Sequence, residues 1–124
     1  DVTGFGLARH AQNLAVRLGL AGFVIDLPSV PLLHGVTPLF EAGIASSLHE
    51  QNQHAIPIHN TGKIPPHSRD VLFDPQTSGG LLGVFRAADA KNAVNALVKS
   101  GHRAAMIGQL DQQTAGITIQ SGGL

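Results

Sequence analysis

The stretch DVTGFGLARHAQNLAVRLGLAGFVIDL, residues 1–27, predicts a loop, a helix and a strand in succession. Between residues 7 and 18 the apolar side chains recur at helical spacing, and Gly19 and Gly22 supply stop signals after them. In residues 23–27, Phe, Ile and Leu alternate with Val and Asp, which is the period of a half-buried strand. A helix followed at once by a strand favours a fold in which both elements share one core.

The middle of the chain gives weaker signals. The segments VTPLFEAGI (36–44) and SSLHEQNQHA (46–55) predict two short helices, the second with a possible capping box formed by Ser47 and Glu50. The segment IPIHNTGKIPPHS (56–68) is expected to be loop, since its prolines interrupt any long element.

The last third predicts a strand, a helix and two further strands. GLLGVF (80–85) is a short apolar strand, and a helix with one apolar stripe starts at Asp89 and ends before Gly101. AAMIGQL (104–110) and GITIQ (116–120) are expected to form a hairpin. Helices that alternate with short strands predict a mixed α/β or α+β sandwich with at least four strands and two substantial helices.

Composition excludes several classes of function. The 124 residues suit one domain with a core, and 43% hydrophobic with 13% charged residues is typical of a globular protein. Eight basic residues balance eight acidic ones, and five Phe with no Tyr or Trp offer few stacking platforms, so nucleic-acid binding is disfavoured. No apolar run approaches the roughly 20 residues of a membrane span. Without cysteine the chain has no disulfide, thiolate ligand or Cys nucleophile.

The motif DVTGFG (Asp1–Gly6) is the first candidate site. It places a carboxylate, a hydroxyl and two glycines directly before a helix, whose first N–H groups are free and carry partial positive charge. An Asp in such a loop can supply oxygen to Mg²⁺, which binds through one or two carboxylates and substrate phosphates. The alternative is that Thr3 caps the helix and the glycines only shape the turn.

The motif DPQTSGG (Asp74–Gly80) is the second candidate. Successive N–H groups of residues 77–80 are suited to an anion-binding nest. The alternative is a tight turn in which Asp74 and Thr77 satisfy local backbone donors. We expect Gly79 and Gly80 to serve the backbone geometry at the entrance to the strand that follows.

The seven histidines do not form a recognisable metal motif. None belongs to an HExxH pattern, and His49 and His54 are not spaced to share a helical face. We interpret all seven as solvated loop residues. They stand at positions 10, 34, 49, 54, 59, 67 and 102.

Together the two motifs resemble a known family. DVTGFGL (1–7) and LFDPQTSGGLL (72–82) closely resemble the C-terminal domain of selenophosphate synthetase (selenide, water dikinase), and the resemblance covers essentially the whole chain. The first motif alone is similar to a wider group of ATP-dependent enzymes that includes aminoimidazole ribonucleotide synthetase. The second motif is more specific to the selenium enzyme.

The resemblance implies a fold, a reaction and a metal ligand. Residues 1–124 are expected to be one C-terminal domain, a three-layer α/β/α sandwich, of a cytoplasmic homodimeric enzyme that makes selenophosphate from selenide, ATP and water and releases AMP and phosphate. The family's metal ligand maps onto Asp1, which implies Mg²⁺, and Thr3 and Gly4 are expected near the ATP phosphates. The catalytic Cys or selenocysteine, its Lys and most ATP ligands belong to the N-terminal domain, so no catalytic residue is assigned here and this piece alone is expected to be inactive.

Two alternatives remain open. One is a domain of a related ATP-dependent synthase or kinase of the same superfamily. The other is a non-catalytic module that binds anions or dimerises.

Overall fold

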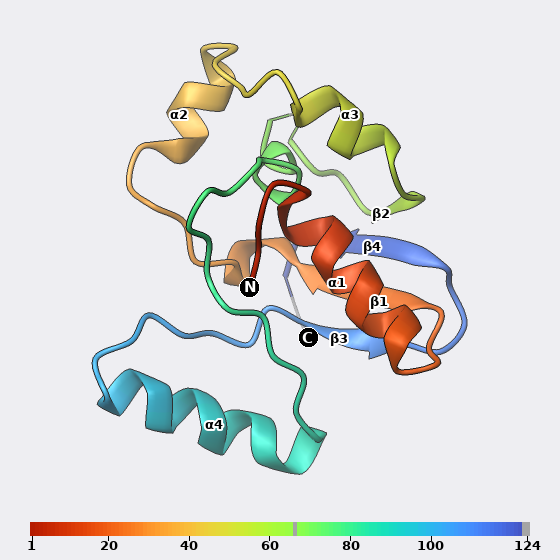
Figure 1. The fold of residues 1–124 in the computed structure, drawn as a ribbon, viewed down its shortest axis with the longest axis vertical. Helices are drawn as coiled ribbons and strands as arrows, with labels where there is room; N and C mark the ends of the chain where they lie inside the picture. Colours follow the sequence, from red (N-terminus) through yellow and green to blue (C-terminus); the bar gives the residue numbers. More distant parts are fainter. Residues whose placement is uncertain (66, 123–124) are drawn as a thin grey trace.

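The computed structural model describes residues 1–65 and 67–122 and contains a mixed α/β fold (Figure 1). Along the chain the elements are α1 (Gly6–Arg17), β1 (Gly22–Asp26), η1 (Leu27–Ser29), α2 (Val36–Glu41), α3 (His49–His54), β2 (Ile58–Thr61), η2 (Asp70–Leu72), α4 (Ala87–Lys99), β3 (Gly108–Asp111) and β4 (Gly116–Gln120), where η marks a 3-10 helix. The predicted succession of loop, helix and strand in residues 1–27 is confirmed.

The sheet has the order β2-β4-β1-β3, with β1 pairing parallel to β4 and antiparallel to β3. The predicted hairpin between residues 104–110 and 116–120 is therefore wrong, because β1 lies between the two strands. The connection from β3 to β4 crosses the start of β1 so closely that a Cβ on Gly22 would lie 2.3 Å from the carbonyl oxygens of Thr114 and Gly116. Gly22 thus makes room for the crossing, whereas α1 ends earlier, at Arg17, and is followed by Gly19 in the left-handed region.

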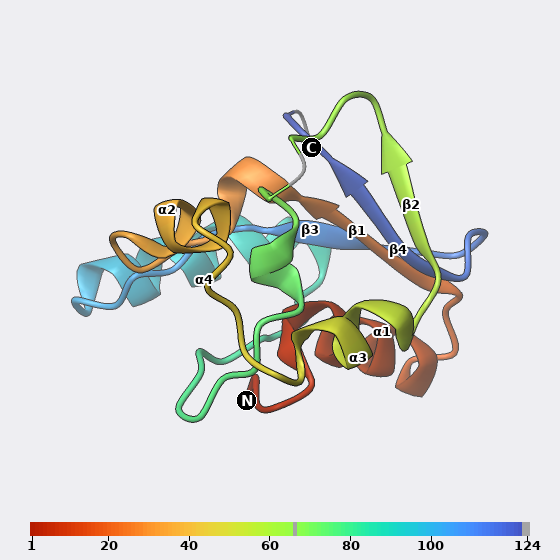
Figure 2. The same cartoon turned by 90° about the horizontal axis from the view of Figure 1, so that it is seen from above.

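The core lies between the sheet and α1. Phe23 and Ile25 of β1 alternate into it beside Ile117 and Ile119 of β4, and the last three are fully buried. The helix meets them with alanines, and these small side chains allow its backbone to approach the sheet. Ala8, Ala11 and Ala15 are all fully buried. Both α1 and α3 lie on this side of the sheet (Figure 2).

The other face of the sheet is mostly polar. One row across it runs from His59 through Thr118 and Val24 to Gln109, and all four side chains are partly or fully exposed. This is the pattern of a sheet with one face packed and the other solvated. The prediction of a mixed α/β fold is confirmed; of the three expected layers, the sheet and the helical layer on its apolar face are seen.

The apolar segment 80–85 is not a strand, which corrects the sequence prediction. An apolar run specifies burial but not a pairing partner, and this segment joins neither edge strand of the described sheet, β2 or β3. Leu81 is 89% exposed. The helix that follows is present as α4, but it lies apart from the sheet (Figure 1), and no side chain of its predicted apolar stripe is fully buried.

Two local predictions in the middle of the chain are also corrected. The segment 56–68, expected to be loop, contains β2, which pairs parallel with β4. The capping box of Ser47 and Glu50 is absent: α3 begins at His49, and no side chain caps it. Within residues 1–65 and 67–122, no helix has the length and apolar character needed to cross a membrane.

Candidate functional site

The two glycine-rich motifs, far apart in the sequence, lie side by side in the structure. The N–H of Val2 donates to the carbonyl oxygen of Gly80 at 2.9 Å, and the N–H of Gln76 donates to the carbonyl oxygen of Thr3 at 3.2 Å. Figure 1 shows the N-terminal segment running beside the chain that enters residues 74–80. We call residues 1–6 the first loop and residues 74–80 the second loop. Their contact forms the candidate site.

Close packing of the loops depends on glycine at one of two neighbouring positions. A Cβ on Gly79 would lie 2.2 Å from the carbonyl oxygen of Val2, so no side chain fits there. A Cβ on Gly80 would meet nothing within 4 Å, and neither residue has positive φ. Both glycines were expected to serve the entrance to a strand, and that strand is absent. Gly79 instead serves the contact with the first loop, and nothing near Gly80 requires a glycine there.

Gly6 has a different role from Gly79. Its φ is +76°, and a Cβ on it would lie 2.9 Å from the carbonyl oxygen of Leu72, so both its conformation and its surroundings favour glycine. It begins α1 and brings the helix against η2, which leads into the second loop. Gly4, in contrast, has open space around it. The first loop therefore carries one glycine at a close contact and one that leaves its backbone accessible.

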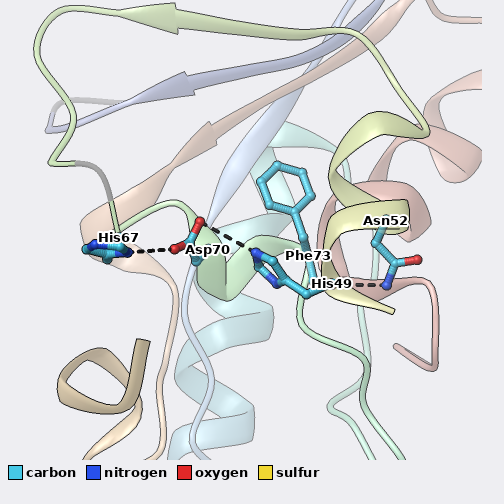
Figure 3. Close-up of polar contacts among 5 residues, drawn as sticks. All are labelled: His49, Asn52, His67, Asp70 and Phe73. Carbon is cyan, nitrogen blue, oxygen red and sulfur yellow. Dashed lines mark hydrogen bonds and ion pairs between the residues drawn. The ribbon is translucent and has the colours of Figure 1, made fainter. Parts of the chain in front are cut away.

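Asn52 of α3 connects the first loop to the residue before the second loop through two hydrogen bonds. Its amide Nδ2 donates to the carbonyl oxygen of Gly4 at 2.9 Å and to that of Phe73 at 3.0 Å, and the residue is only 6% exposed (Figure 3). Phe73 directly precedes the second loop. The sequence analysis missed Asn52, since a single Asn in a short polar helix carries no pattern that distinguishes it from a solvated residue.

Thr3 does not cap α1, so that part of the structural interpretation of the first loop is wrong, whereas Gly6 does shape the turn as that interpretation expected. No side chain caps this helix; instead, the N–H of Thr3 donates to Nε2 of His10 at 3.1 Å, and the Thr3 hydroxyl lies 3.0 Å from the same nitrogen. Because Nε2 accepts from a backbone N–H, the ring of His10 is neutral. Burial lowers the pKa of His10.

This contact predicts a pH dependence of stability. The pKa of His10 is lower in the folded protein than its ordinary value of about 6.5 in the unfolded chain. The unfolded state therefore takes up more protons in this range, so the free energy of unfolding is highest above pH 6.5 and falls as the pH drops toward the folded-state pKa. Urea unfolding between pH 5 and 8 measures the slope. His10→Gln should reduce it, whereas His102→Gln, at an exposed side chain, should not; equal slopes in all three proteins would contradict the assignment.

The other predicted site residues fall on or next to this contact. Asp1 is exposed, and within the part of the chain that the structure describes its carboxylate has no partner. The carboxylate of Asp74 already has a partner, because one of its oxygens accepts a hydrogen bond from Nε2 of Gln76 at 3.0 Å. The N–H groups of residues 77–80 make no hydrogen bond with the described residues. None of these four has positive φ, so an alternating αR–αL nest is absent although its donors are free.

Four histidines correct the view that all seven are solvated loop residues: His54 ends α3 and His59 lies in β2, and the other two are His10 and His49. His10 lies in α1, and His49 packs between the rings of Phe40 and Phe73 with its Nε2 3.6 Å from a carboxylate oxygen of Asp70 (Figure 3). Among residues 1–65 and 67–122, no group of three His, Cys, Asp or Glu side chains is placed to hold a metal ion.

Comparison with known proteins agrees with the motif resemblance. No protein-family model matches the chain. A selenide, water dikinase of Citrifermentans bemidjiense is 38% identical over 114 residues, which is 90% of this chain and 32% of that protein. The protein of the same name from Geobacter sp. strain M21 has the same identity and coverage. The one from Escherichia coli K12 is 40% identical over 96 residues, 77% of this chain and 27% of that protein.

The chain is homologous to part of the selenide, water dikinases. It spans about a third of the length of the curated relatives it matches. The name of these relatives describes an activity of proteins about three times as long. The similarity therefore relates this chain to one part of those proteins.

Proposed function

We propose that this chain is the C-terminal domain of a selenophosphate synthetase, an enzyme that makes selenophosphate from selenide, ATP and water with release of AMP and phosphate. The observation that carries the proposal is the 38% identity to selenide, water dikinases over 90% of the chain. This similarity extends over nearly the whole chain, so the two motifs are not isolated matches.

The contact between the two loops supports a role at the phosphates of ATP. The start of α1 has no acidic residue in its first turn and no capping side chain, and of its first N–H groups that of Gly6 donates to the carbonyl oxygen of Thr3 at 3.0 Å. The partial positive charge of this helix start is therefore not neutralised by a side chain. The backbone at Gly4 is open beside it, and the free N–H groups of residues 77–80 lie on the adjoining loop. Such donors can stabilise negative charge on phosphate oxygens during phosphoryl transfer.

Asp1 fits a single carboxylate ligand of Mg²⁺ but not a complete site. Its exposed carboxylate is unpaired within the described residues, and Mg²⁺ is commonly bound by one or two carboxylates together with substrate phosphates and water. The remaining ligands would come from ATP and from other parts of the enzyme. The bound metal would neutralise phosphate charge, while Asp1 positions it and Thr3 and Gly4 hold the loop beneath.

Further features belong to the same proposal. The intact enzyme would be a cytoplasmic homodimer whose N-terminal domain carries the catalytic Cys or selenocysteine, and this chain alone would not turn over. Its full architecture would be the three-layer α/β/α sandwich shared with aminoimidazole ribonucleotide synthetase-type enzymes. The helical layer of α1 and α3 on the apolar face of the sheet supports this architecture.

The proposal predicts a large loss of activity on removing the Asp1 charge in the full-length enzyme. We expect Asp1→Asn to lower kcat for AMP formation from ATP and selenide by at least about 100-fold and to raise the Mg²⁺ concentration needed, the range found on removing one preorganised electrostatic group. The assay measures AMP release against Mg²⁺ concentration.

The matched control is Asp89→Asn on α4, where among the described residues the lost carboxylate pairs with exposed Arg86. It should keep wild-type activity, and both variants should melt like the wild type. Full activity and unchanged Mg²⁺ dependence in Asp1→Asn would overturn the metal role. Absence of selenide-dependent AMP formation by the wild-type enzyme would overturn the assigned reaction.

A further inference from the structure

A cavity of about 410 Å³ lies beside the end of α3. It opens between the end of α3, the start of β2 and η2, and its lining mixes three apolar with three polar side chains. These are Ile56, Ile58, Phe73, Gln53, His54 and Arg69. Its volume is within the range of small-molecule sites. Only Phe73 also neighbours the second loop, so the cavity is separate from the candidate site for phosphate transfer.

Arg69 is the unusual member of this lining. Its Nε is buried and has no hydrogen-bond partner, and its guanidinium forms no ion pair within the described residues. The adjacent carboxylate does not serve it: Asp70 is engaged by His67 at 3.1 Å and by His49 at 3.6 Å (Figure 3). A permanently charged group with a buried, unsatisfied donor is costly unless something pairs with it.

We propose that this cavity binds a small organic anion, with its carboxylate or phosphate group on Arg69 and its apolar part against the aliphatic and aromatic lining. The planar guanidinium favours a two-oxygen acceptor such as a carboxylate or a phosphate. His54 and Gln53 supply further polar groups at the rim, whereas Ile56, Ile58 and Phe73 give an apolar wall that a bare inorganic ion would leave unused. No acidic side chain lines the cavity to repel an anion.

The site is tested by isothermal titration of the full-length protein with phenyl phosphate, benzoate, inorganic phosphate and benzyl alcohol. We expect phenyl phosphate or benzoate to bind in the millimolar range or tighter, inorganic phosphate to bind at least about 10-fold more weakly, and the neutral alcohol not to bind. The two aromatic anions distinguish a phosphate ligand from a carboxylate ligand. Arg69→Gln should weaken binding of the preferred anion by about 10- to 100-fold, as for loss of a charge-assisted hydrogen bond.

The matched control is Arg17→Gln, which removes the same charge from an exposed position at the end of α1. It should change binding less than twofold. Equal binding by wild type and Arg69→Gln, an equal loss in Arg17→Gln, or no binding of either aromatic anion at 10 mM would overturn the proposal.

A stability measurement separates ligand binding from a structural role of Arg69. Since Arg69 has no partner in the described structure, Arg69→Met should melt at a temperature no lower than the wild type while losing the anion. Added anion should raise the Tm of the wild type and not that of Arg69→Met. A lower Tm for Arg69→Met without anion would show that the guanidinium supports the fold, and the proposal would fail.

Discussion

Gly79→Ala is expected to destabilise the protein by about 2–4 kcal/mol, because the new methyl group would lie 2.2 Å from the carbonyl oxygen of Val2. That oxygen belongs to a backbone which cannot retreat freely: Val2 is 7% exposed, and its own N–H is bonded to Gly80. The steric overlap between the methyl group and this oxygen can therefore be relieved only if the two loops move apart. Urea unfolding of the wild type and the variant measures the loss.

Gly80→Ala is the matched control, one residue away and with no atom within 4 Å of the added methyl group. Its φ is not positive, so alanine should be tolerated within about 0.5 kcal/mol. If Gly79→Ala and Gly80→Ala were equally stable, the packing between the loops would be wrong. Wild-type stability of Gly79→Ala combined with loss of phosphate transfer in the intact enzyme would instead assign Gly79 a direct chemical role.

Asn52→Asp is expected to have a comparably large effect, a loss of about 3–5 kcal/mol near neutral pH. The change replaces the donor that both the Gly4 and Phe73 carbonyl oxygens share with a carboxylate that cannot donate, at a residue only 6% exposed. Two acceptors are left unsatisfied, and a buried negative charge faces two carbonyl dipoles. The measurement is the free energy of unfolding from pH 4 to 8.

The pH dependence identifies the cause of this loss. Burial and the facing carbonyl oxygens raise the pKa of the introduced carboxyl group above its unfolded value of about 3.9, so the deficit should shrink as the pH falls and the group regains a proton to donate. Asn95→Asp, at an exposed position of α4, should stay within about 0.5 kcal/mol of the wild type. A loss in the free energy of unfolding that does not vary with pH, or one equal to that of Asn95→Asp, would contradict the role of Asn52 as a buried donor to both carbonyl oxygens.

The connection of both loops through Asn52 has a consequence for the proposed function. Gly4 is placed beside the start of α1, and Phe73 leads directly into the second loop, so one amide sets the relative position of the two free donor groups. Loss of this tie should therefore affect phosphate transfer in the intact enzyme more than the stability loss alone explains. Activity measured well below the Tm of the Asn52 variants separates the two effects.

The local elements at both ends of the chain could be predicted from the sequence. Periodicity indicated α1 and β1, and the short apolar alternation of residues 116–120 indicated β4. The two glycine motifs were also evident, because Gly, Asp and Thr in dense succession are rare outside turns and binding loops. These signals depend on residues close in sequence, which is the range over which side-chain period and backbone preference act.

Pairing was predicted less well because it depends on which partners meet. The apolar segment 80–85 has the composition of a strand but joins no strand of the described sheet, although Gly80 accepts one backbone hydrogen bond from Val2, and β3 pairs with β1 in place of β4. Residues 58–61, inside a proline-rich segment, form β2 because they pair with the edge of β4 that β1 leaves open. A strand is completed by its neighbour, so its existence is a property of the tertiary structure.

The sequence by itself determined the helical and strand character of residues 1–27, the mixed α/β class and the two glycine-rich motifs that identify the relatives. Only the tertiary structure decided that these motifs meet, that Gly79 and not Gly80 makes their contact possible, and that Asn52 and Arg69 matter. The physical reason is one of distance. A glycine is required where another backbone approaches it, and a buried polar group is defined by the partner it has or lacks, and both partners come from segments far along the chain.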